Sequence, residues 1–339
     1  MRSVLSRPCR LSLRRTTSST TSSSSPPPPL VVFEHHHRDG EGPPTATLTL
    51  NGPPVNSLNL EMLSALGNAI VEAEESGSCR GFVLASSHPT IFSAGLDIAE
   101  LHNPDEGRLR DFWCALQDVF LALYGSRCAT VAAIDGHAPA GGCLLAAACD
   151  ERIMASGGRF GIGLNESKLG IVAPSWFADA LQPLVGQRRL ERMLQLGSLL
   201  SPAEALEAGL VDELAEHGGG NPIRGAARGV EGGEEEGQGQ GKSRSGGDAP
   251  PRSPVLTRAH ERLQQYVTVD PQARQMAKLL LRSDAIERLR EKKQEDADAF
   301  VAFCLSPRYQ ANISEYLEGL KNRNNKKQEG ERLRGDTSD

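Results

Sequence analysis

The chain has 339 residues, enough for one large domain or two ordinary ones with a substantial core. Its formal net charge is -6, and no run of lysine and arginine is interleaved with aromatic residues, so binding to nucleic acid is not expected. No apolar run approaches the roughly 18 residues that a membrane-spanning helix needs. The seven cysteines form no CxxC pair, which indicates buried thiols in a reducing compartment and no disulfide framework.

The amino terminus differs in composition from the rest of the chain. Its first 25 residues contain five arginines, many serines and threonines and no acidic residue, and the first acidic residue is Glu34. This composition is typical of a mitochondrial transit peptide, which we place at residues 1–30, and it lacks the continuous apolar run of a secretory signal. A disordered serine-rich tail is the alternative. A transit peptide predicts a protein of the mitochondrial matrix.

From residue 31 the pattern is that of a folded domain. Apolar runs predict three strands, which are TATLTL (45–50), GFVLAS (81–86) and TVAAIDG (130–136). Residues 58–76 have the spacing of a helix that ends at Gly77. Strands that alternate with helices predict an α/β domain with mostly parallel pairing over residues 31–216. Near its end, SPAEALEAGLVDEL predicts a helix capped by Ser201, with proline at its first position, and then a strand.

Three regions are expected beyond this core. Residues 217–254 are poor in apolar residues and dense in glycine, glutamate and proline, so we expect a disordered insert. Residues 255–322 have a helical pattern, interrupted by Asp-Pro at 270–271 and by Ser-Pro at 306–307. The tail, residues 323–339, is expected to be disordered.

Three glycine-containing turns stand between a strand and a helix: IFSAGLDIAEL (91–101), HAPAGGCLLA (137–146) and FGIGLNESKLGI (160–171). The helix after Gly141 and Gly142 begins with unpaired N–H groups and the positive end of its dipole. An N–H group of the SAGLD turn could converge with them on one oxygen and form an oxyanion hole, which stabilises charge on a carbonyl oxygen. Close packing of the glycines is the other explanation of these turns.

Glu166 is the candidate acid–base residue. It stands in an otherwise uncharged run, after a glycine-rich turn, at the expected start of a helix with Asn165 as its cap. A carboxylate in apolar surroundings has a raised pKa, which suits a general base. An exposed glutamate in the capping region of a helix is the competing interpretation.

Neither a metal site nor a catalytic serine is predicted. The adjacent His35, His36 and His37 follow a proline-rich segment and point in different directions, as in a solvated loop. Ser93 precedes Ala-Gly but lacks the G-x-S-x-G sequence that surrounds a nucleophilic serine.

Five segments occur in the order and spacing of the crotonase (enoyl-CoA hydratase/isomerase) superfamily: PPVNSLNLEML, FSAGLDIAEL, PAGGCLLAAACDERIMA, GIGLNESKLGIVAPSW and SPAEALEAGLVDEL. The resemblance covers residues 45–215 and resumes over 255–322. Within the superfamily the chain most resembles the mitochondrial Δ3,Δ2-enoyl-CoA isomerases. The resemblance implies an α/β crotonase-like spiral of ββα turns with a C-terminal helical region. It also implies a homotrimer that acts on an acyl-CoA thioester.

The resemblance implies roles for individual residues as well. The backbone N–H groups of Leu96 and Gly141 would bind the thioester oxygen, and Glu166 would be the catalytic acid–base residue. The residues implied to bind substrate are Ser93, Ala94, Gly95, Leu96, Asp97, Gly141 and Asn165. Hydratases of the superfamily carry a second catalytic glutamate, at a position that is Leu144 in this chain.

The implied reaction converts cis- or trans-3-enoyl-CoA to the trans-2-enoyl-CoA used by β-oxidation, with no metal or redox cofactor. Glu166 alone would carry the proton from C2 to C4. An enoyl-CoA hydratase of the same fold is the nearest alternative, and Leu144 counts against it. A catalytically idle acyl-CoA-binding or RNA-binding relative is a further alternative. The acidic net charge opposes RNA binding, and the presence of Glu166 opposes an idle protein.

Overall fold

The computed structural model describes residues 27–36, 42–75, 79–157, 159–217 and 253–319, together with residue 322. The predicted tail lies outside these ranges, as do the predicted transit peptide up to residue 26 and residues 218–252 of the predicted insert.

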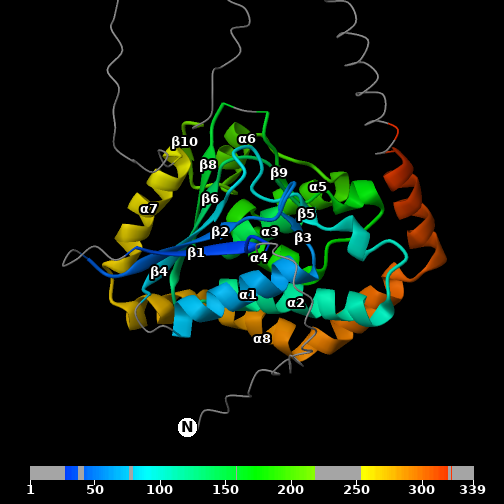
Figure 1. The fold of residues 1–339 in the computed structure, drawn as a ribbon, viewed down its shortest axis with the longest axis horizontal. Coiled ribbons are helices and arrows are strands. Elements are labelled where there is room, and N and C mark those ends of the chain that lie inside the picture. The colour runs from blue at the N-terminus through cyan, green and yellow to red at the C-terminus, as the bar shows by residue number, and fades with distance from the viewer. Residues whose placement is uncertain are drawn as a thin grey trace, which may run out of the picture.

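One six-stranded sheet contains all three strands that the apolar runs predict (Figure 1). Its order is β1-β2-β4-β6-β8-β10, in which β1 is antiparallel to β2 and the other neighbours are parallel. The strands are β1 (Val31–His36), β2 (Thr45–Leu50), β4 (Gly81–Ser86), β6 (Ala129–Ile134), β8 (Glu151–Ala155) and β10 (Glu213–Ala215). The prediction of an α/β domain with mostly parallel pairing is confirmed.

Four successive units run from a strand of this sheet through a short strand to a helix. The short strands are β3 (Ser57–Leu58), β5 (Gly95–Leu96), β7 (Ala138–Pro139) and β9 (Ile162–Gly163). The helices are α1 (Leu60–Glu75), α2 (Glu106–Tyr124), α3 (Gly141–Ala148) and α4 (Ser175–Val185). Short 3-10 helices precede two of them: η1 (Ile98–Glu100) before α2 and η2 (Glu166–Leu169) before α4. The short strands pair as β3-β5 and β7-β9, so the expected spiral of ββα turns is confirmed.

The strand β2 is buried on both faces, although an alternating sequence is typical of a strand with one exposed face. Its threonines are tolerated there because they find partners: Thr47 Oγ1 lies 2.7 Å from Nε2 of His36 and 3.1 Å from Nε2 of His260. Burial on both faces follows from the helices, which cover the sheet on its two sides (Figure 1).

Local sequence explains where the helices begin. In α1 the apolar positions Met62, Leu66 and Ala69 are buried at helical spacing, and the Asn59 side chain accepts the N–H of Met62 at 2.8 Å. The helix α5 (Gln187–Leu196) follows α4, and α6 (Pro202–Ala208) follows α5. Ser201 caps α6 in a capping box with Glu204, as the sequence predicts, and β10 comes next.

Helices make up the C-terminal region. They are α7 (Pro254–Val267), α8 (Pro271–Cys304) and a further helical segment over residues 307–319, with breaks at both predicted Pro-containing positions. The helix α7 lies against β4, β6 and β8, and a Cβ at Gly81 of β4 would come within 2.7 Å of Leu263. On the other side, α8 runs beside α2, which in turn packs against α1 (Figure 1).

Candidate active site

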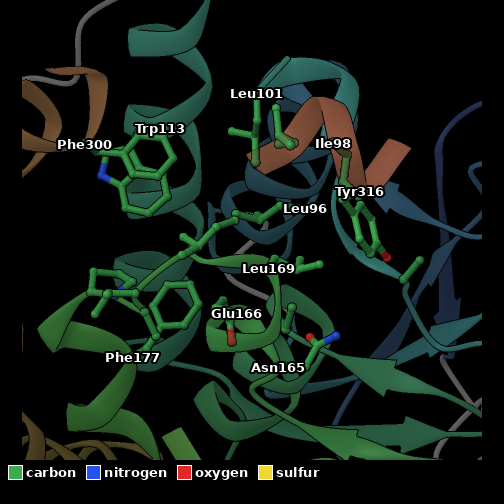
Figure 2. A pocket seen from close by; sticks show the side chains of 17 residues that line it. Leu96, Ile98, Leu101, Trp113, Asn165, Glu166, Leu169, Phe177, Phe300 and Tyr316 are labelled. Carbon is green, nitrogen blue, oxygen red and sulfur yellow. The ribbon is translucent and has the colours of Figure 1, made fainter. Parts of the chain in front are cut away.

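A pocket of about 800 Å³ lies where the turns after β5, β7 and β9 meet α2, α4 and α8 (Figure 2). Glu166 is the single carboxylate among the residues that line it. The lining residues are Ala94, Leu96, Ile98, Leu101, Trp113, Ala140, Asn165, Glu166, Leu169, Ile171, Val172, Ala173, Pro174, Phe177, Phe300, Ile313 and Tyr316. The pocket therefore surrounds one ionisable carboxyl group with an almost wholly apolar wall.

Glu166 is buried in this wall. Only 8% of the residue is exposed, and neither carboxylate oxygen has a hydrogen-bond partner within the described part of the chain. Burial raises the pKa of Glu166 to about 7, because apolar surroundings disfavour the charged form. A carboxyl group with such a pKa can both take up and return a proton near neutral pH. The raised pKa expected from the uncharged run is confirmed.

Two glycines fix the path of the chain around Glu166. Gly163 has φ +148°, and a Cβ there would lie 2.5 Å from the carbonyl oxygen of Ser198. Gly170 ends η2 with φ +71°, where its N–H bonds back to the carbonyl oxygens of Glu166 and Ser167. Both positions require glycine because a side chain would be strained or would collide.

The expected helix start at this place is a 3-10 helix, η2. Asn165 occupies its N-cap position, but the Asn165 side chain makes no capping hydrogen bond. The prediction that Asn165 caps the helix is therefore wrong for its side chain. Instead its Oδ1 is buried without a hydrogen-bond partner among the described residues, and the residue lines the pocket.

The helix α3 starts at Gly141, where its first N–H groups have no intrahelical partner. Ala140, just before it, has φ +50° and ψ -121°, a backbone conformation that favours glycine. Hydrogen bonds hold Ala140 on both sides: its N–H donates to the Gly163 carbonyl at 2.8 Å, and its carbonyl accepts the Leu144 N–H at 3.1 Å. Surrounding structure thus fixes the point at which α3 begins.

The turn containing Gly95 and Leu96 lies directly against the start of α3. A Cβ at Gly95, which has φ +88°, would lie 2.9 Å from Cβ of Ala140 and 3.2 Å from N of Gly141. The Asp97 N–H donates to the Leu58 carbonyl of β3 at 3.1 Å. Successive N–H groups of a strand point to opposite sides, so the N–H of Leu96 points away from β3. Backbone N–H groups from two distant turns therefore lie close together beside the pocket, which Leu96 lines and Gly141 does not.

This arrangement places a buried carboxyl group near two backbone N–H groups. Preorganised N–H groups in a site that excludes water can stabilise negative charge that develops on a carbonyl oxygen. A partly protonated carboxyl group in the same pocket can remove a proton from the neighbouring carbon. The chemistry that the geometry supports is proton abstraction next to a carbonyl group, with an enolate as the intermediate.

Some of the other predicted site residues line the pocket, and others only stabilise the backbone turns next to it. Ala94 lines the pocket, as do Leu96 and Asn165. Ser93 is fully buried and is not a lining residue: its hydroxyl donates to the Asn56 carbonyl at 2.7 Å and accepts the Gly95 N–H at 3.2 Å. The Asp97 side chain caps η1 by accepting the Ala99 N–H at 2.9 Å.

Leu144 is fully buried in α3, and the first turn of this helix carries no acidic residue. The site therefore holds one carboxylate where the hydratase arrangement would hold two.

Within the described ranges, no group of three or more histidine, cysteine, aspartate or glutamate residues could hold a metal ion. His35 and His36 belong to β1, contrary to the expected loop, and His37 lies outside the described residues. In those same ranges no helix is long and apolar enough to cross a membrane.

Sequence reasoning missed the aromatic side of the pocket. Trp113 of α2 and Phe300 of α8 stack with ring centroids 3.4 Å apart and an interplanar angle of 10°, and Phe177 of α4 lines the same pocket (Figure 2). One signal was available, because the chain has only two tryptophans: Trp113 lines the pocket, and Trp176 packs against Trp113 with ring centroids 5.8 Å apart.

Comparisons with known sequences identify the family of the chain. Residues 44–217 match the model of the family described as Enoyl-CoA hydratase/isomerase. The chain is 36% identical over 282 residues to enoyl-CoA delta isomerase 1, mitochondrial, of Mus musculus, covering 83% of this chain and 86% of that protein. Identity to the Homo sapiens protein of the same name is also 36%, over 83% of this chain and 81% of the relative. Crotonyl-CoA hydratase of Syntrophomonas wolfei is 31% identical over 50% of this chain and 65% of its own length.

Solved structures lead to the same group of proteins. The crystal structure of human mitochondrial delta3-delta2-enoyl-CoA isomerase superposes with a TM-score of 0.73 at 35% identity, covering 87% of this chain and 99% of that chain. The enoyl-CoA hydratase from Bacillus halodurans has a TM-score of 0.66 at 23% identity, over 84% of this chain and 99% of its own, and shares the fold.

Proposed function

Because the chain belongs to the enoyl-CoA hydratase/isomerase family, we propose that it is an isomerase that converts cis- or trans-3-enoyl-CoA to trans-2-enoyl-CoA. The substrate is an acyl-CoA thioester, and the product is the conjugated enoyl-CoA that enters β-oxidation. Glu166 is the acid–base residue, and the N–H groups of Leu96 and Gly141 bind the thioester oxygen.

In the first step Glu166 removes a proton from C2 of the substrate. The electrons of that C–H bond move into the thioester, so that a dienolate forms with its negative charge on the thioester oxygen. The two backbone N–H groups stabilise that charge without any reorganisation at the moment of reaction. In the second step the protonated Glu166 gives its proton to C4, which leaves the double bond between C2 and C3.

A pKa near 7 suits both steps. The unprotonated form is present in quantity at neutral pH to take the C2 proton, and the protonated form is acidic enough to return it. Because Glu166 has no hydrogen-bond partner among the described residues, no polar neighbour has to be displaced while the proton moves.

The observation that carries this proposal is that, among the described residues that line the pocket, Glu166 is the single carboxylate. Hydration of a double bond requires a water molecule that is held and activated, for which the hydratases of this superfamily use two glutamates. Here the second position is Leu144, which is fully buried. One base is enough to move a proton from C2 to C4, so the isomerase fits this site better than the hydratase.

A protein that only bound acyl-CoA would have no use for Glu166. Burial of a carboxyl group without a hydrogen-bond partner destabilises the fold, and an apolar or amide side chain at this position would avoid that loss. The unfavourable burial is explained when the group is needed for proton transfer.

The reaction needs no metal or redox cofactor. Substrate and product are isomers, so no electrons are transferred to or from an outside acceptor. Coenzyme A enters only as part of the substrate.

We place the protein in the mitochondrial matrix. Relatives named as mitochondrial support a mitochondrial location, and the arginine-rich, acid-free first 25 residues support import into the matrix.

We also propose that the protein is a homotrimer, as the resemblance implies. Three apolar side chains of α8 are strongly exposed in the single chain: Met276 by 72%, Leu280 by 81% and Leu281 by 86%. An exposed apolar cluster of this kind is typical of a protein–protein contact. The cluster Met276–Leu280–Leu281 is therefore our candidate subunit contact.

The direct test is turnover of 3-hexenoyl-CoA by the purified protein, followed by the ultraviolet absorbance of the conjugated product. We expect absorbance to rise with both the cis and the trans substrate. In a parallel reaction, trans-2-hexenoyl-CoA should keep its absorbance, because hydration would remove the conjugated double bond. Loss of absorbance there, with no isomerisation of 3-hexenoyl-CoA, would identify a hydratase instead.

A further inference from the structure

The pocket has two chemically different ends. Trp113, Phe177 and Phe300 lie on one side of Glu166, and Asn165 and Tyr316 lie on the other (Figure 2). The first end carries these three aromatic rings, and they come from three helices that pack against one another.

The second end leads to a polar groove. Leu169 and Tyr316 line both the pocket and this groove, whose other residues include Lys168, Asn312 and Glu315. Coenzyme A is large, charged and hydrophilic, so it must leave the pocket where polar surface and solvent begin. The apolar end of the acyl chain then points the opposite way, toward Trp113 and Phe300.

Asp296 stands behind the aromatic end. It precedes Phe300 by one turn on α8, so the two side chains share a helix face. Its Oδ2 accepts three hydrogen bonds: from Nε1 of Trp113 at 2.7 Å, from Nε2 of Gln117 at 2.7 Å and from Nε1 of Trp176 at 3.2 Å. Hydrogen bonds to a charged acceptor are stronger than neutral ones. This single carboxylate therefore connects α2 and α4 to α8 and fixes the plane of the Trp113 indole.

We propose that the stacked pair Trp113–Phe300 closes the acyl end of the pocket and thereby sets the longest acyl chain that the enzyme accepts, with Asp296 as the residue that positions the pair. This inference rests on the proposed function. The preferred substrates are those 3-enoyl-CoA thioesters whose terminal methyl group reaches no farther than the Trp113 ring.

The test compares kcat/KM for 3-hexenoyl-, 3-octenoyl-, 3-decenoyl- and 3-dodecenoyl-CoA in wild type and in Phe300→Ala. The wild type should lose activity toward the longer chains, because additional methylene groups have no space beyond the aromatic pair. Removal of the Phe300 ring should raise the ratio of kcat/KM for dodecenoyl- over hexenoyl-CoA by about tenfold or more, since one methylene in an apolar pocket changes kcat/KM by roughly 10–200-fold. Trp113→Leu is a second variant that shortens the same wall from α2.

Phe303→Ala is the matched control. Phe303 is on the same helix and packs against Tyr309 in a tilted arrangement, with ring centroids 5.0 Å apart, but it does not line the pocket. The ratio of kcat/KM for dodecenoyl- over hexenoyl-CoA in Phe303→Ala should equal that of the wild type.

The outcomes separate this inference from the function on which it rests. A wild type that turns over no chain length would overturn the proposed function. An active wild type with equal kcat/KM for all four chain lengths would overturn the proposed limit on acyl-chain length. Folded Phe300→Ala and Trp113→Leu variants that both keep the wild-type ratio would overturn that limit as well.

Asp296 is tested against Asp298, its neighbour on α8. Asp298 pairs with Arg110 of α2, so both aspartates connect the same two helices, but only Asp296 binds Trp113. Asp296→Ala should raise the dodecenoyl-to-hexenoyl ratio, and Asp298→Ala should leave it unchanged. Asp296→Asn keeps an oxygen acceptor and should restore the ratio toward wild type. Equal ratios in Asp296→Ala and Asp298→Ala would overturn the positioning role of Asp296.

Discussion

The backbone nitrogen of Leu96 lies 3.4 Å from the point that a Cβ on Gly141 would occupy, and Cδ1 of Leu58 lies 2.9 Å from the same point. A methyl group at residue 141 would displace the end of the Leu58 side chain and would stand against the Leu96 nitrogen, between the two expected backbone donors. We expect Gly141→Ala to reduce kcat for 3-hexenoyl-CoA by about 10²–10³-fold, the loss typical when one oxyanion donor is removed. Turnover and thermal unfolding of the variant are measured together.

Gly67→Ala provides the control for that substitution. Gly67 lies inside α1, and a Cβ there would meet only Val119 Cγ2 at an ordinary 3.6 Å. Alanine in a helix is more stable than glycine by roughly 0.5–1 kcal/mol, so this variant should melt slightly higher and keep full activity. A Gly141→Ala enzyme with normal kcat would contradict the assignment of the Leu96 and Gly141 N–H groups.

Glu166→Gln removes the base while it keeps the size of the side chain. We expect isomerisation to fall by about 10²–10⁴-fold, the range of general acid–base catalysis. Affinity for an acyl-CoA should stay close to wild type, because the expected thioester contacts come from backbone groups. The measurement is kcat together with acyl-CoA affinity by calorimetry in the same variant. Near-normal kcat would exclude Glu166 as the base, and a joint loss of kcat and affinity would indicate a distorted site.

The activity should depend on pH through Glu166. Burial raises the pKa of this carboxyl group to about 7, and only the unprotonated form can take the C2 proton. We therefore expect kcat/KM to increase about tenfold for each pH unit well below 7 and to level off above it. An inflection at the ordinary pKa of an exposed glutamate, about 4.3, would show that the carboxyl group is solvated in the working enzyme.

Replacement of residues 218–252 by a short glycine–serine linker should leave turnover unchanged. The two flanking residues meet at one place, because Ser253 Oγ donates to Asp135 Oδ2 at 2.8 Å and His217 is close enough to influence Asp135. Burial raises the pKa of Asp135, and both neighbours oppose that rise. Each halving of the number of residues in a flexible loop stabilises a fold by roughly 0.6 kcal/mol. The melting temperature should therefore stay level or rise. Loss of soluble, active protein would show that the segment contributes to the fold.

Charge on the exposed cluster of α8 should separate the subunits. We expect Leu280→Glu with Leu281→Glu to convert the trimer to monomers, because each glutamate would have to be buried in the contact. Mass from light scattering gives the oligomeric state. Leu206→Glu on α6, where the leucine is 41% exposed, is the control and should remain trimeric. A wild type that is already monomeric would contradict the proposed trimer.

Local stretches of sequence specify several of the elements and the main chemical groups of this protein, although they did not predict β1. Strands such as β2 and β4, and the helices α1 and α6, follow from apolar periodicity and capping residues, which are properties of a short segment. Glu166 is identifiable for the same reason, because its neighbours in the chain are uncharged. Glycine-rich turns mark where backbone N–H groups become available, and they are visible without any knowledge of the fold.

Which of these groups face one another depends on the folded chain as a whole. Ser93 and Ala94 are adjacent in the chain, yet Ser93 is fully buried outside the pocket and Ala94 lines the pocket. Trp113 and Asp296 are 183 residues apart and nevertheless share a hydrogen bond of 2.7 Å. Contacts of this kind depend on how whole helices pack, and no local pattern encodes the packing partner. The proposed catalytic group could therefore be found from sequence, whereas the aromatic wall that we propose as the limit on its substrate depended on the arrangement of α2, α4 and α8.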